Sequence, residues 1–212
     1  MSVRISRVAR GGLAVSAIAT DVRYTPEDLL EMPGSVGYEL VDGRLVEREM
    51  SALSSRVGVK LSRRLDAFAD ERNLGEVFGA DCSYQCFRDE PDKVRKPGVS
   101  FIARGKLPLG QLVRGHVRIP PDLAAEVVSP NDLYTSLDEK VEEYREAGVR
   151  LIWVINPGTR TVVVHRADGT TSRLTENDEL FGEDVLPGFR CRVGDLFPSA
   201  EVSEAARNAV AG

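Results

Sequence analysis

Residues 123–155 read LAAEVVSPNDLYTSLDEKVEEYREAGVRLIWVI, and this stretch decides the fold. Leu123–Val128 forms a short apolar strand that is interrupted by one carboxylate, and Leu151–Ile155 is a nearly continuous apolar strand of the kind found in a sheet covered on both faces. Between them, Ser136 and Glu139 have the spacing of a capping box, which predicts a helix that Gly148 closes. A strand, a helix and a second strand form a βαβ unit, so we expect the two strands to be parallel.

The flanking sequence adds antiparallel elements. Asp-Gly turns at 42–43 and 168–169 lie between alternating segments and predict hairpins over 38–47 and 161–174. Ser51 precedes a helix whose apolar stripe is expected to be buried; the stripe comprises Leu53, Val57, Leu61, Leu65 and Phe68. The predicted class is α/β. A central mixed sheet should have helices on both faces, a parallel pair in the middle and antiparallel hairpins at the edges.

Composition limits the classes of function. The chain has 212 residues, 42% apolar and 29% charged, with a net charge of −5, which fits one globular domain and excludes bulk attraction to nucleic acid or to an anionic membrane. No stretch is long enough to span a membrane. Three cysteines and two histidines argue against a zinc site or a disulfide framework, so we expect a cytoplasmic protein. We expect a disordered extension over 1–23, a working domain over 24–198 and a tail over 199–212.

Glu126 is the most informative single residue. It lies in the middle of an apolar strand, where a carboxylate needs a metal, a lysine or hydrogen-bond donors to offset burial. Lys140 falls beside the inward stripe of the next helix and is a candidate partner; a structural ion pair and a functional pair fit the spacing equally well. Glu39, within the first hairpin, is a third candidate, although spacing alone favours an exposed acid on an edge strand.

Several motifs in this order resemble the Uma2 family of the PD-(D/E)XK, restriction-endonuclease-like superfamily, over about Tyr24 to Phe197. They are YELVDG at 38–43, RKPGVSF at 95–101, EVVSP at 126–130, and Lys140 followed by Tyr144, Gly148 and Trp153. The resemblance implies an endonuclease that hydrolyses DNA with Mg²⁺ or Mn²⁺. It assigns Glu126 and Glu39 as metal ligands and Lys140 as the group that orients the attacking water or stabilises charge. It also implies a possible homodimer, because many nucleases of this superfamily pair to cut both strands.

One position departs from the family pattern. The family's Pro-Asp pair is Pro97-Gly98 here, so the first metal ligand is missing and we expect weak metal binding and impaired cleavage. Asp92 could in principle reach the site, and Ser55 stands where many relatives carry histidine. The alternative function is an inactive pseudo-nuclease that binds DNA or a protein, with Arg56 and Lys60 as candidate phosphate contacts; a solvated helix face is the alternative explanation for these two residues. A small-molecule enzyme has little support, because the chain lacks a phosphate-binding glycine loop and a Ser-His-Asp arrangement.

Overall fold

The computed structural model describes residues 22–48, 51–107, 115–129 and 134–198. Its main elements in chain order are α1 (Pro26–Glu31), β1 (Tyr38–Val41), β2 (Arg44–Glu47), α2 (Ala52–Arg72), β3 (Gly75–Gly79), β4 (Val99–Ala103), β5 (Leu123–Val127), α3 (Tyr134–Ala147), β6 (Leu151–Asn156), β7 (Thr161–Arg166), β8 (Thr171–Thr175), β9 (Glu179–Phe181) and β10 (Arg190–Arg192). The predicted extension over 1–23 and tail over 199–212 lie outside these ranges, apart from residues 22 and 23.

Six strands form the central sheet in the order β3-β4-β5-β6-β7-β8. β5 and β6 are parallel, with Leu123 opposite Leu151, and every other neighbouring pair is antiparallel. The helix α3 makes the crossover between the parallel strands. The predicted βαβ unit and its place in the middle of a mixed sheet are therefore confirmed.

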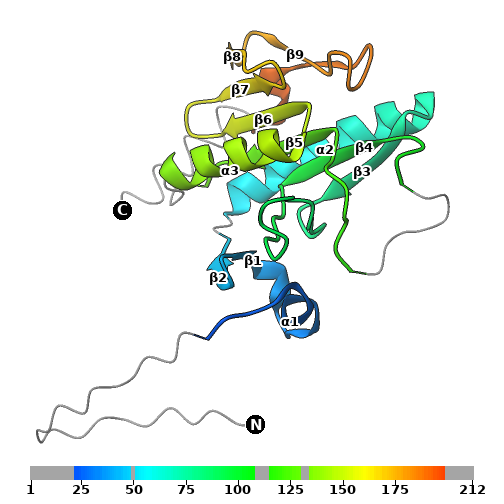
Figure 1. Cartoon of the computed structure of the whole chain (residues 1–212). Coiled ribbons are helices and arrows are strands. Elements are labelled where there is room, and N and C mark those ends of the chain that lie inside the picture. Colours follow the sequence, from blue (N-terminus) through cyan, green and yellow to red (C-terminus); the bar gives the residue numbers. More distant parts are fainter. Residues whose placement is uncertain (1–21, 49–50, 108–114, 130–133, 199–212) are drawn as a thin grey trace, which may run out of the picture.

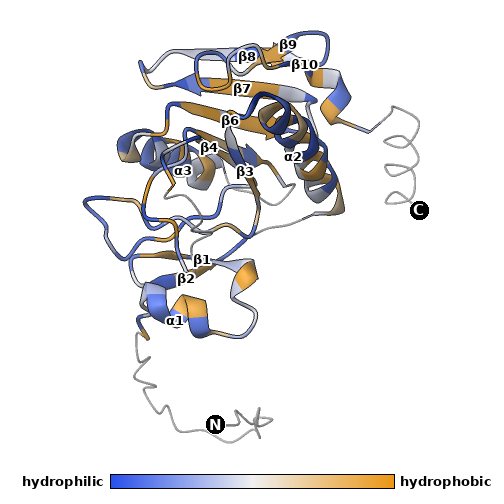
Figure 2. Ribbon diagram, turned by 90° about the vertical axis from the view of Figure 1, so that its right-hand side faces the viewer, coloured by the Kyte–Doolittle hydropathy of each residue, from blue (hydrophilic) through white to orange (hydrophobic). Residues whose placement is uncertain are grey.

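The two long helices cover opposite faces of this sheet. Val57, Leu61 and Leu65 of α2 pack on the face that carries Trp153 and Ile155, whereas α3 packs on the face that carries Ala124, Ile152 and Val154. Figure 2 shows the apolar β6 lying between α2 and α3. The burial of both faces explains why 151–155 is apolar without alternation.

Two details of the helices differ from the sequence expectation. Leu53 is exposed and Ser54 is buried in its place, because the Ser54 hydroxyl lies 3.2 Å from the hydroxyl of Ser129 across the fold. The helix α3 is already helical at Tyr134, so the predicted capping box at Ser136 is wrong. Gly148 does close α3, with a φ of 95° and its amide donating to the carbonyl of Arg145.

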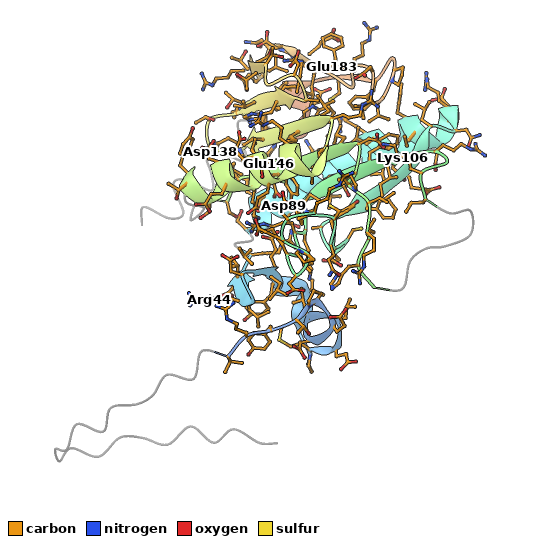
Figure 3. The ribbon with its side chains drawn as sticks, viewed as in Figure 1. Arg44, Asp89, Lys106, Asp138, Glu146 and Glu183 are labelled. Atoms are coloured by element: carbon orange, nitrogen blue, oxygen red, sulfur yellow. The ribbon has the colours of Figure 1, made fainter. Side chains whose placement is uncertain are left out.

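The first hairpin is formed as predicted but does not join an edge of the central sheet. Asp42 and Gly43 both have positive φ, as a tight two-residue turn requires, and β1 and β2 make their own two-stranded sheet. Two backbone hydrogen bonds of 2.9 and 2.8 Å between Leu40 and Val94 attach it to the segment before β4. Figure 1 shows β1, β2 and α1 to one side of the central sheet, and Figure 3 labels Arg44 there. The hairpin is thus a separate unit beside the central sheet.

The second hairpin, β7–β8, does lie at an edge of the central sheet. Beyond it, β9 and β10 pair in a further small sheet that the sequence analysis did not anticipate. Within the described part of the chain, no helix combines the length and the apolar character needed to cross a membrane.

Candidate active site

A pocket of about 480 Å³ lies where the first hairpin, the N-terminal half of α2 and the N-terminal half of α3 meet the ends of β4 and β5. Its lining includes Glu39, Arg48, Ser55, Gly98, Glu126 and Lys140. Residues that are up to 101 positions apart in the sequence therefore share one cavity, and all of the principal sequence candidates are among them.

Glu126 reaches the pocket from β5. It lies on the same strand face as Ala124, the face that α3 covers, and it is buried. The hydroxyl of Tyr144 on α3 donates a hydrogen bond of 2.8 Å to Oε1 of Glu126. Oε2 makes no hydrogen bond within the described part of the chain. Burial raises the pKa of Glu126 above that of an ordinary glutamate, although the charge of Lys140 opposes the shift.

Glu39 is buried, not exposed as its edge-strand position suggests. Its Oε1 accepts from the backbone amide of Lys96 at 2.9 Å and its Oε2 accepts from Nη1 of Arg95, also at 2.9 Å. The ammonium of Lys140 lies 3.2 Å from Oε1 and 3.0 Å from Oε2. Burial alone would raise the pKa of Glu39, but the charges of Lys140 and Arg95 outweigh it and hold that pKa below its usual range.

Lys140 stands on the inner side of α3, where its ammonium pairs with Glu39 and its charge also acts on Glu126. Burial acts to lower its pKa, but the neighbouring charges of Glu126 and Glu39 raise it above the ordinary lysine range. Lys140 therefore stays a cation at neutral pH. The structure thus brings Glu39, Glu126 and Lys140 together; the functional roles expected of them remain predictions.

A buried network of ion pairs adjoins Glu39 and Lys140, and it was not predicted from the sequence. Arg95 is almost fully buried and forms two hydrogen bonds with Glu143 of α3, Nε to Oε2 at 2.6 Å and Nη2 to Oε1 at 2.8 Å, besides its bond to Glu39. Lys93 donates to Glu143 at 2.7 Å. Burial acts to lower the pKa of Arg95, and the contacts with Glu143 and Glu39 outweigh that effect and raise it. The only sequence signal was the place of Arg95 in the RKPG motif.

Gly98 lines the same pocket, immediately before β4. Val99 is opposite Ala125 in the antiparallel register, which places Gly98 next to the part of β5 that carries Glu126. A Cβ on Gly98 would lie 3.1 Å from the carbonyl oxygen of Ala125. Asp92 is exposed and is not part of the pocket lining, so it does not supply a carboxylate in place of the missing aspartate.

The two basic residues predicted to contact phosphates have different surroundings. Arg56 is exposed on α2. The ammonium of Lys60 donates to the backbone carbonyls of Asp195 at 3.1 Å and of Phe197 at 2.8 Å, which anchors the end of the domain to α2. A nucleic-acid role for either residue stays a prediction.

The donor set is small for a metal site. Within the described ranges, no group of three or more His, Cys, Asp or Glu side chains could hold a metal ion. Mg²⁺ nevertheless needs only one or two protein carboxylates when substrate phosphate and waters complete its shell. The free Oε2 of Glu126 meets that minimum, so the residues fit a divalent ion that is held mainly by its substrate.

The chain thus has an α/β fold, with helices on both faces of a mixed six-stranded sheet, and its pocket brings together Glu39, Glu126 and Lys140. The family model of Uma2, described as "Putative restriction endonuclease", matches residues 26–194, and the chain belongs to this family.

A solved structure has the same fold. It is described as a putative nuclease belonging to DUF820, from Anabaena variabilis, and it matches with a TM-score of 0.69 at 18% sequence identity, covering 82% of this chain and 97% of its own. No curated protein matches the chain. The expectations of fold class and of family are therefore confirmed.

Proposed function

We propose that the chain is a divalent-metal-dependent endonuclease that hydrolyses phosphodiester bonds of DNA, with activity weakened by Gly98. The observation that carries this proposal is the convergence of Glu126, Lys140 and Glu39 in one pocket of a Uma2 fold. A carboxylate with one free oxygen beside a fixed ammonium is suited to reactions in which negative charge develops on phosphate.

Each residue of the pocket has a proposed task. Glu126, oriented by Tyr144, would hold Mg²⁺ or Mn²⁺ through Oε2. When bound, the ion would lower the pKa of a water molecule and neutralise charge on the phosphate. Lys140 would hold a permanent positive charge next to the scissile phosphate and orient the attacking water. Glu39 was also expected to be a metal ligand; that assignment stays a prediction, and the contacts of Glu39 favour a different role, which is to hold Lys140.

A nicking assay on supercoiled plasmid tests the proposal. We expect slow conversion to open circles with Mg²⁺ or Mn²⁺, no conversion with EDTA, and a loss of at least about tenfold in Glu126→Gln, because the free carboxylate oxygen is lost. Glu146→Gln is a matched control, since Glu146 is an exposed acid on α3 outside the pocket (Figure 3). Equal cleavage by the natural chain and by Glu126→Gln would contradict the proposal.

The pH dependence of metal binding follows from the environment of Glu126. Burial raises its pKa, so its protonated form persists to higher pH than that of an ordinary glutamate, and protons compete with the ion for Oε2. We therefore expect the affinity for Mn²⁺, measured by calorimetry from about pH 8 down to about pH 5, to begin to fall above the ordinary glutamate range near pH 4.3. Affinity that stays constant down to pH 5 would show that proton uptake by Glu126 does not control binding.

The alternative is a pseudo-nuclease that has kept the fold as a module for binding DNA or a protein. Gly98 favours it, because this position of the pocket has no side-chain oxygen with which to bind a metal ion. The lining carries four acids (Glu39, Glu47, Glu126 and Glu139) against three bases (Arg48, Arg95 and Lys140), which is a weak attraction for a polyanion. A rise in melting temperature with Mn²⁺ would favour the enzyme, since a ligand of the folded state stabilises it. The expectations of a homodimer and of a cytoplasmic location also stay predictions.

A further inference from the structure

The carboxylates of Glu39 and Glu126 differ in how many of their acceptor positions are occupied. A carboxylate offers about four lone-pair positions. At Glu39, the amide of Lys96 and the ammonium of Lys140 meet Oε1, while Arg95 and the same ammonium meet Oε2. Glu39 thus accepts three hydrogen bonds of 2.9 to 3.2 Å, and the ammonium of Lys140 also lies 3.0 Å from Oε2, so both oxygens are occupied by donors.

Glu126 shows the opposite pattern. Tyr144 occupies one position on Oε1, and Oε2 has no hydrogen-bond donor in the described part of the chain. An incoming cation could bind Glu126 without displacing a protein group. To bind Glu39, it would have to displace the ammonium of Lys140 or the Nη1 donor of Arg95 from a buried carboxylate, which breaks a buried ion pair at a high cost.

The donors around Glu39 also link three parts of the fold. Arg95 joins Glu39 on β1 to Glu143 on α3, and Glu143 is three residues beyond Lys140 on the same helix. The amide of Lys96 fixes the Glu39 carboxylate against the segment that precedes β4. Donors from three parts of the fold therefore hold the carboxylate in place, and it can restrain a lysine side chain that would otherwise sample many rotamers.

We propose that Glu39 is a positioning residue that holds the ammonium of Lys140 in the pocket and is not a metal ligand. This inference rests on the proposed function. In this arrangement Glu126 is available to bind the metal ion, whereas Glu39 holds the ammonium of Lys140. Loss of Glu39 should then reduce turnover through Lys140 while leaving metal affinity nearly unchanged.

Calorimetric titration of Mn²⁺ into the natural chain, Glu39→Gln and Glu126→Gln tests this arrangement. We expect Glu126→Gln to weaken binding by at least about tenfold and Glu39→Gln to change it by less than about threefold. In the plasmid assay at saturating Mn²⁺, Glu39→Gln should lose at least about tenfold in rate, and Glu39→Asp, which keeps the charge, should recover part of it. Weakening of Mn²⁺ binding by Glu39→Gln to the same extent as by Glu126→Gln would overturn the proposal.

A second measurement separates this inference from the proposed function, because it needs neither metal nor DNA. Acetylation of Lys140 by acetic anhydride, followed by mass spectrometry, should be several-fold faster in Glu39→Gln than in the natural chain, since the ammonium loses the charged carboxylate that holds it, and Glu39→Asp, which keeps the charge, should be intermediate. Lys106, which pairs with Asp122 away from the pocket, is the internal reference. If the natural chain binds no Mn²⁺ and cuts no DNA, the proposed function fails, and the labelling rate alone decides. An unchanged rate for Lys140 would overturn the positioning role.

Discussion

Cleavage of supercoiled plasmid by the Gly98→Asp variant is expected to exceed that of the natural chain by about 100-fold in the presence of Mg²⁺. Gly98 lines the pocket and precedes β4 next to the part of β5 that carries Glu126. A second carboxylate there would let the site hold the ion before substrate binds, where Glu126 alone relies on phosphate to complete the shell. The measurement is the initial nicking rate, with Mn²⁺ affinity by calorimetry as the companion readout.

The Gly98→Asp substitution also introduces a close contact, so a control variant with the same contact is needed. The new Cβ would be 3.1 Å from the carbonyl oxygen of Ala125, so β5 must shift by a few tenths of an ångström, and we expect a loss of stability on the order of 1 kcal/mol. Gly98→Asn imposes the same contact without the charge and should stay at the natural rate. The gain should disappear when Glu126→Ala is added. Equal gains from asparagine and aspartate would show that shape, and not the carboxylate, limits the reaction.

Replacing Arg95 with methionine should lower the free energy of unfolding by about 3 kcal/mol or more. Methionine fills much of the volume, so the loss reports on charge. Glu143 loses both hydrogen bonds from Arg95 and keeps Lys93, and Glu39 keeps only Lys140 and the amide of Lys96. Urea unfolding followed by circular dichroism measures the change.

Two variants calibrate the Arg95 result. Arg95→Lys keeps the charge but loses the planar fork that reaches both acids, so its stability should be intermediate. Arg145→Met removes an exposed arginine that pairs with Glu142 on the same helix, and its unfolding midpoint should remain close to that of the natural chain. A loss below about 1 kcal/mol in Arg95→Met would mean that water reaches the two carboxylates once the guanidinium is gone.

The elements that the sequence predicted well are those with local causes. The βαβ unit follows from the apolar pattern of 151–155, and each hairpin follows from its Asp-Gly turn. Glu126 could be singled out because a carboxylate inside an apolar strand conflicts with its surroundings. Lys140 followed because the crossover returns α3 over β5.

The elements that sequence reasoning missed depend on distant packing. A turn encodes the hairpin 38–47 but not the strand it will pair with, so the attachment of Leu40 to Val94 could not be foreseen. The same holds for the link between Arg95 and Glu143, which requires the segment before β4 to pass beneath α3. The alternation of β1 likewise gave no sign that Glu39 would be buried, because its cover comes from other parts of the chain.

The separate two-stranded sheet of the first hairpin gives this protein two levels of cooperativity. The hairpin contributes Glu39 to the pocket and is attached by the bridge between Leu40 and Val94, by the polar contacts of Glu39 and by a small apolar cluster around Leu29, Leu40 and Val94. A unit outside the central sheet, held by these contacts, can open at a lower free energy than the six-stranded core. Opening would separate Glu39 from Lys140 while β5 and Glu126 stay folded. The pocket could therefore open and re-form many times before the whole molecule unfolds once.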